Sequence, residues 1–178
     1  MSASDQGSGG EPARAPQSVR VQATQGIPSM WYLGVAMVAL GMFVLSMGGG
    51  LWGLDHHHLY HRLAVMAFDP LCHQAPDRSL MLSGTTMAVC SRCLGIYGAF
   101  SIGLLLFPGV VGGMRVYSFG VGVRLILLSL GIMVLDFIGN GVGLWTNTHL
   151  SRILTGVFFG CSLSWFMAGE RNNQPKAR

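Results

Sequence analysis

The sequence CSRCLGIYGAFSIGLLLFPGVV, residues 90–111, joins two cysteines to a long uncharged run. The run from Leu94 to Val111 approaches the length of about 20 residues with which an α-helix crosses the hydrocarbon of a bilayer. Cys90 and Cys93 directly precede it, so two thiols are expected at one end of a membrane-spanning helix. Thiolates in such a place hold a transition metal or exchange electrons.

The composition of the whole chain agrees with a membrane protein. Of its 178 residues, 51% are hydrophobic and only 10% are charged, whereas about 25% are charged in a soluble domain. The 26 glycines suit helices that approach each other closely in lipid. The lysines and arginines are spread through loops and tails, which favours a role in membrane orientation and predicts no nucleic-acid partner. The lipid bilayer is the expected partner.

Apolar length predicts an all-α fold, an integral membrane four-helix bundle. Residues 30–169 form the membrane domain, with spans at about 30–51, 94–111, 124–145 and 153–168. Residues 1–29 are rich in Ser, Gly, Pro and Gln and are expected to be a disordered tail, and residues 170–178 a polar C-terminal tail. The first span starts late and is long, so we expect an uncleaved anchor and not a signal peptide.

The basic residues predict the orientation of these spans. More of them fall on the side of the two termini than on the other side, which places both termini in the cytoplasm of a multi-pass cell-membrane protein. Residues 55–93 then form a long extracytoplasmic loop between the first and second helices. The cysteines and the polar residues of the third and fourth spans converge at this outer face, where a site between the helices is expected.

The motifs of this region resemble the signature of a family of small multi-span bacterial and archaeal membrane proteins of unknown function. The resemblance runs from about Tyr60 to Gly160 and implies a shared membrane layout and a shared polar site, without an established activity. It is carried by Cys72-His73-Gln74, Arg78-Ser79, Cys90-Ser91-Arg92-Cys93-Leu94-Gly95-Ile96-Tyr97, Asp136, Arg152 and Thr155-Gly156.

A metal site is the first interpretation of the thiols. Cys90 and Cys93 have the C-x2-C spacing that lets two thiolates bind one ion, and Cys72 with His73 would complete a Cys3His set. Zinc is the default ion, and iron or copper would suit the same soft donors. Adjacent Cys and His ligands need an awkward backbone, so the alternative is that one of them stays off the metal and Asp136 or His61 replaces it.

Thiol–disulfide chemistry is the second interpretation. A C-x-x-C motif at the start of a helix gains thiolate stabilisation from the backbone amides, and Arg92 adds a positive charge. Four-span thiol oxidases that pass electrons to quinone resemble this layout, with Cys72 as a partner thiol here. Those enzymes normally use a second cysteine pair, which the loop between the third and fourth spans lacks. A small transporter, which would need a homo-oligomer for a wide pore, and a lipid-modifying enzyme are further alternatives.

Asp136 is the strongest candidate outside the cysteines, because an acidic residue inside a span is costly and usually has a partner. Arg152 is its expected counter-charge, with Arg92 as the alternative. These three residues are the candidates for catalysis; the alternative is an ion pair that only locks the third and fourth spans together. The polar residues expected around the ligands are Gln74, Arg78, Ser79, Arg92, Tyr97, Asp136, Asn140, Arg152 and Thr155.

Overall fold

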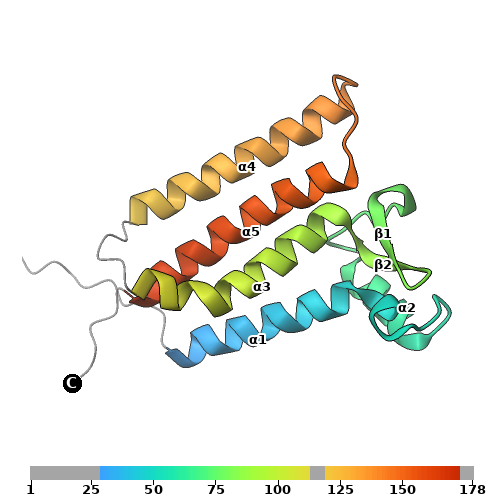
Figure 1. Cartoon of the computed structure of the whole chain (residues 1–178), viewed down its shortest axis with the longest axis horizontal. Helices are drawn as coiled ribbons and strands as arrows, with labels where there is room; N and C mark the ends of the chain where they lie inside the picture. The colour runs from blue at the N-terminus through green and yellow to red at the C-terminus, as the bar shows by residue number, and fades with distance from the viewer. Residues whose placement is uncertain (1–28, 113–118, 173–178) are drawn as a thin grey trace, which may run out of the picture.

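Four long helices lie side by side in one row in the computed structural model, which describes residues 29–112 and 119–172. They are α1 (Ser29–Ser46), α3 (Ser91–Gly112), α4 (Phe119–Gly141) and α5 (His149–Asn172). Their order across the row is α1, α3, α5, α4 (Figure 1), and extended contacts join each helix to its neighbour in the row. The expected bundle is therefore a flat layer, in which α4 packs along α5.

Smaller elements occupy one end of this row, which we call the hairpin end. They are η1 (Gly48–Trp52), α2 (Leu59–Phe68), η2 (Pro76–Arg78), β1 (Ser79–Leu82) and β2 (Thr85–Cys90). The two strands pair antiparallel, with Leu82 opposite Thr85. The chain is mostly helical, as expected, but the hairpin within the expected long loop at 55–93 means that the fold is not strictly all-α. Ser83 and Gly84 supply the two positive φ angles, 52° and 80°, that a tight hairpin turn requires.

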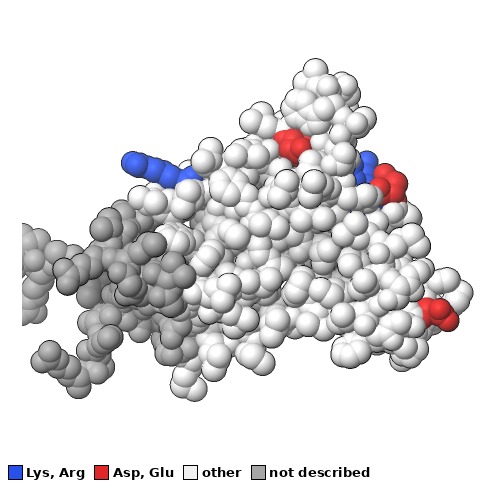
Figure 2. Space-filling model, in the orientation of Figure 1, with Lys and Arg blue, Asp and Glu red and all other residues white. Residues whose placement is uncertain are grey.

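Three of the described helices contain stretches that are long and apolar enough to cross a membrane. These stretches are Ser91–Pro108, Phe119–Gly141 and His149–Glu170, and the apolar part of α1, Met30–Ser46, is shorter. Their outward faces carry large exposed apolar side chains, among them Leu127, Leu128 and Leu135 on α4. Charged side chains are sparse on the face in Figure 2, where they lie near the start of α4 and in the half that carries the hairpin. Such a surface suits contact with lipid.

The helix ends differ from the expected spans for local reasons. The first helix stops at Ser46, and Gly48 after it adopts a left-handed backbone, φ +60°, that does not continue an α-helix. Gly50 then packs closely on β1, where a Cβ would lie 2.6 Å from the carbonyl oxygen of Leu82. Helix α3 continues past Pro108 to Gly112, and α5 continues to Asn172. The expected N-terminal tail, up to residue 28, lies outside the described residues, as do residues 173–178.

Glycines set the distance between α3 and α5. A Cβ on Gly95 would lie 2.5 Å from the Ile153 carbonyl oxygen, and one on Gly156 would lie 2.2 Å from that of Arg92. Only glycine permits backbones to pack this closely. The contact holds the backbone of Arg92 against α5, so it also fixes the first turn of α3.

Successive long helices run in opposite directions. Helices α1 and α4 end at the hairpin end, whereas α3 and α5 begin there (Figure 1). A small core stabilises the hairpin end, where Phe68 of α2 packs with Ala88 and Val89 of β2. The segment from α1 to α3 and the loop from α4 to α5 therefore meet at this end, and they form the site described next.

Candidate functional site

Three cysteines meet at the hairpin end although they come from three different elements. Cys72 follows α2, where its amide donates to the Phe68 carbonyl at 2.8 Å. Cys90 is the last residue of β2, and Cys93 lies in the first turn of α3. Their Sγ atoms all lie within 4.8 Å of one another, and none of the three forms a disulfide. The structure thus brings together three of the four expected ligands.

This thiol cluster fits a transition metal. Thiolates that bind zinc tetrahedrally at about 2.3 Å lie about 3.8 Å apart, and the observed sulfur separations are compatible with that after small adjustments. His73, the fourth expected ligand, is exposed. It lines a pocket together with the three cysteines, but its ring nitrogens do not belong to the set of ligand atoms that lie within 4.8 Å of one another. Three protein ligands with a position left over are typical of zinc sites that bind a further molecule.

Hydrogen bonds within the cluster favour a thiolate at Cys90. Those with the Cys72 and Cys93 thiols hold the pKa of Cys90 below its usual value, and the amides of Cys93 and Arg92 act in the same direction, while burial opposes them. The Cys90 amide in turn donates to the Cys72 sulfur at 3.2 Å. A thiolate is the form of cysteine that binds metals and attacks disulfides.

A pocket of about 310 Å³ opens beside the thiol cluster. Its walls come from the segment after α2, the first turn of α3, the end of α4 and the start of α5. Three arginines reach it from different elements. Its lining is Leu71, Cys72, His73, Ala75, Arg78, Cys90, Arg92, Cys93, Phe137, Asn140, Gly141, Asn147 and Arg152.

Behind this pocket, Asp136 forms an ion pair with Arg92, and only 14% and 17% of the two side chains are exposed. The expected counter-charge was Arg152; that expectation is wrong, because Arg152 lines the pocket without an ion pair among the described residues. The expected ion pair between the third and fourth spans, α4 and α5, is therefore wrong in its partner helix, because the pair joins α4 to α3.

Asn147 is a site residue that the sequence did not reveal. Its Nδ2 donates to Asp136 Oδ2 at 2.7 Å, and its backbone amide donates to Asn140 Oδ1 at 2.9 Å. The loop turns back toward α4 at Gly143, which has φ +75°. The Gly-rich stretch before Asn147 was the available signal for this turn.

Besides Asp136, four of the expected polar residues lie outside the pocket lining. Gln74 has φ +44° and its Nε2 donates to the Val65 carbonyl at 2.6 Å, so it ties its loop to α2. The Ser79 hydroxyl donates to Ala75, and the Thr155 hydroxyl donates to Arg152 within its own helix. Tyr97 packs against Phe68, with ring centres 5.4 Å apart. These contacts support the scaffold of the site.

His61, weighed as a substitute ligand, is a core residue. Its side chain is 5% exposed, and its Nδ1 accepts a hydrogen bond from the Gly49 amide at 3.2 Å. Burial lowers its pKa, and the neighbouring His56 acts in the same direction. It packs against the glycines of η1 and is not part of the thiol cluster.

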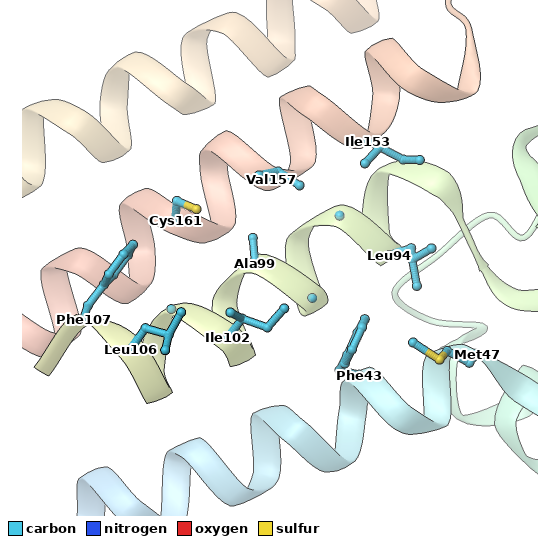
Figure 3. Close-up of a pocket in the computed structure, with 13 residues that line it drawn as sticks. Phe43, Met47, Leu94, Ala99, Ile102, Leu106, Phe107, Ile153, Val157 and Cys161 are labelled. Atoms are coloured by element: carbon cyan, nitrogen blue, oxygen red, sulfur yellow. The ribbon is translucent and has the colours of Figure 1, made fainter. Parts of the chain in front are cut away.

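A second cavity, of about 480 Å³, lies between α1, α3 and α5 and is apolar (Figure 3). Phe43, Ile102 and Val157 represent its three walls, and Cys161 of α5 lines it apart from the thiol cluster. Its apolar lining suits hydrocarbon. Cys161 therefore lies outside the candidate site and is a suitable control for substitutions of the other three cysteines.

Comparison with known proteins finds two archaeal relatives that each match part of the chain. An uncharacterized protein of Methanocaldococcus jannaschii is 29% identical over 98 residues, which cover 54% of this chain and 61% of that protein. One of Methanothermobacter thermautotrophicus is 44% identical over 46 residues, which cover 25% of this chain and 41% of that protein. The chain thus spans about three fifths or less of these relatives, and no solved structure matches it.

The family comparison covers the site itself. The matching family model is described as "Predicted membrane protein (DUF2085)" and aligns with residues 72–166, just over half of the chain. The match begins at Cys72 and includes Cys90, Cys93, Asp136 and Arg152. The expected kinship with membrane proteins of unknown function is confirmed, and this chain belongs to the predicted membrane protein family DUF2085.

Proposed function

We propose that this protein is a four-span cell-membrane protein that binds a transition metal, zinc by default, through Cys72, Cys90 and Cys93. The observation that carries the proposal is the approach of three thiols from separate elements to within 4.8 Å. A chain that only needed to pack small apolar groups would gain little from gathering three thiols at the mouth of a polar pocket. His73, or a molecule in the pocket, would take the remaining position.

The count of four spans includes α1. Its apolar part has 17 residues, about 26 Å of helix at 1.5 Å per residue, against a hydrocarbon thickness of about 30 Å. Helix α1 packs along α3, where the Ser101 hydroxyl donates to the Ala39 carbonyl at 2.8 Å, and its outward side chains are apolar. Helix α1 would span the bilayer if its axis lies close to the membrane normal and the bilayer thins slightly around it.

The distribution of basic residues supports cytoplasmic termini and an extracytoplasmic thiol cluster. A C-terminal fusion to green fluorescent protein should then fluoresce, and a fusion to alkaline phosphatase at the same position should be inactive. An active phosphatase with a dark fluorescent fusion would reverse the orientation and place the pocket in the cytoplasm.

Zinc with an available position supplies Lewis acidity. The residues of this chain would hold the metal and shape the pocket around its fourth coordination position. The lowered pKa of Cys90 favours its thiolate form. The ion pair of Arg92 and Asp136, to which Asn147 donates a hydrogen bond, would hold the buried wall of the pocket in place. Arg78, Arg152 and Asn140 reach the pocket and would contact the molecule that enters it.

Elemental mass spectrometry on the full chain, purified in mild detergent, tests the metal site. About one metal ion per chain is expected, with loss of most of it in Cys72→Ser, Cys90→Ser and Cys93→Ser. Cys161→Ser is the matched control, because Cys161 lies outside the thiol cluster, and should retain the metal. Equal metal content in all four variants would contradict the site.

Thiol–disulfide exchange with quinone is the second candidate, because Cys90 and Cys93 form a C-x-x-C motif at the start of α3 with Cys72 beside it. Two thiols would become one disulfide, and the two electrons and two protons released would reduce a quinone to a quinol. Thiol titration with and without reductant tests it. Purified protein without metal but with two thiols that react only after reduction would favour this candidate over the metal.

A further inference from the structure

Apart from the cysteines of the thiol cluster, the charged residues in the lining of this pocket are all arginines. Arg78, Arg92 and Arg152 line it from η2, α3 and α5, and no carboxylate is among the described lining residues. Asp136 pairs with Arg92 from behind the wall. Asp77 approaches Arg78 at 3.5 Å, in an exposed pair whose mutual attraction solvent weakens.

The guanidinium group of Arg152 has donors to spare. Arg152 has no hydrogen bond or ion pair from its side chain within residues 29–112 and 119–172. The Nε of Arg92 is buried and has no hydrogen-bond partner among the described residues. Burial closes that atom off from the pocket, so Arg152 is the guanidinium group with free donors that a ligand can reach. Guanidinium groups are best matched by the oxygens of phosphate or carboxylate.

The other residues of the pocket indicate where such an anion comes from. Leu71 and Phe137 also line it, and 61% and 62% of these apolar side chains are exposed. Phe137 belongs to a membrane-spanning helix whose outward face is apolar. A ligand with a phosphate beside Arg152 and an apolar tail along Phe137 would match both the arginines and the apolar side chains of the lining. A free phosphate ion would leave the apolar part uncovered.

We propose that this pocket binds the phosphate group of a lipid, with Arg152 as its principal charged contact. The inference rests on the proposed membrane placement of the pocket, but it does not require the metal. The molecule expected beside the thiol cluster is therefore an amphipathic phosphate ester from the bilayer.

Native mass spectrometry of the full chain in detergent tests the inference with three probes. Phosphatidic acid carries the phosphate and the tails, diacylglycerol with the same chains lacks the phosphate, and inorganic phosphate lacks the tails. Phosphatidic acid should bind, diacylglycerol should not, and inorganic phosphate should not displace the lipid. In Arg152→Gln the affinity should fall about tenfold or more, which corresponds to the loss of a charged hydrogen bond.

Arg124→Gln is the matched control, since Arg124 is exposed near the start of α4, away from the hairpin end, and its loss should leave binding unchanged. Equal binding of diacylglycerol, equal loss in both variants or full displacement by inorganic phosphate would overturn the inference. Metal content is measured on the same samples. Arg152→Gln should retain the metal. If lipid binding depends on Arg152 but no metal is found in any sample, the proposed metal site is contradicted and the lipid site is not.

Discussion

Arg92 at the start of α3 and Asp136 on α4 form a largely buried ion pair, and this pair joins two helices that share few other contacts. Asn147, in the loop before α5, donates a further hydrogen bond to the same carboxylate oxygen at 2.7 Å. The pair therefore holds α4 against the rest of the row at the level of the pocket. It links the membrane-spanning layer to the thiol cluster, because Arg92 lies between Cys90 and Cys93.

Asp136→Asn should destabilise the protein by about 3 kcal/mol, because it leaves the buried Arg92 charge without a partner. Unfolding by denaturant in detergent micelles would measure this. The double variant Arg92→Met with Asp136→Leu should recover much of the loss, since no charge stays buried. Asp77→Asn is the control: its carboxylate is 73% exposed, and its removal should cost less than about 1 kcal/mol. Equal effects at positions 77 and 136 would refute the role given to the pair.

Gly156→Ala should separate α3 from α5, because its Cβ would lie 2.2 Å from the Arg92 carbonyl oxygen. A loss of about 1–3 kcal/mol is expected from such overpacking, seen as a lower melting temperature in detergent. Gly131→Ala is the matched control on α4, where a Cβ meets nothing within 4 Å. A variant at 156 as stable as the variant at 131 would show that the helices do not pack as described.

His61 should make the stability depend on pH. Its pKa in the folded protein is lowered from 6.5, so the unfolded chain binds the proton more tightly. The stabilisation is therefore fully present above pH 6.5 and is lost as the pH falls from there toward the folded pKa. Melting temperatures between pH 5 and 8 would show the slope. His61→Asn should reduce it, whereas His149→Asn, which removes an exposed imidazole, should not; an unchanged slope in His61→Asn would contradict the assignment.

His73→Ala should weaken metal binding less than any of the three cysteine variants. Its ring lines the pocket but lies outside the thiol cluster, so three ligands remain in place. Competition with a chromogenic chelator would rank the affinities. If His73→Ala releases metal as readily as Cys72→Ser, His73 is a full ligand and the metal has a closed Cys3His shell.

The membrane character and the thiol cluster could be predicted from the sequence because each has a strong local signal. Uncharged runs as long as Leu94–Val111 are typical of membrane-spanning helices, and the C-x2-C spacing with Cys72-His73 stands out from an apolar chain. The acidic Asp136 was conspicuous for the same reason, since a carboxylate within a span needs a partner.

The partner of Asp136 and the role of Asn147 depend on tertiary structure. Arg92 and Arg152 both lie near the hairpin end of a span, so the sequence does not determine which of them pairs with Asp136. The hairpin was missed because its strands have four and six residues, too few for a clear alternation. The Ser83-Gly84 turn was its one strong local signal.

X-ray absorption spectroscopy at the zinc edge, on the full chain purified with its metal, tests the central claim most directly. The account predicts three sulfur neighbours at about 2.3 Å and one nitrogen or oxygen neighbour at about 2.0–2.1 Å. In Cys90→Ser the sulfur contribution should fall with the metal content, and in Cys161→Ser it should not. A shell of nitrogen and oxygen without sulfur, or a protein that retains no metal, would contradict it.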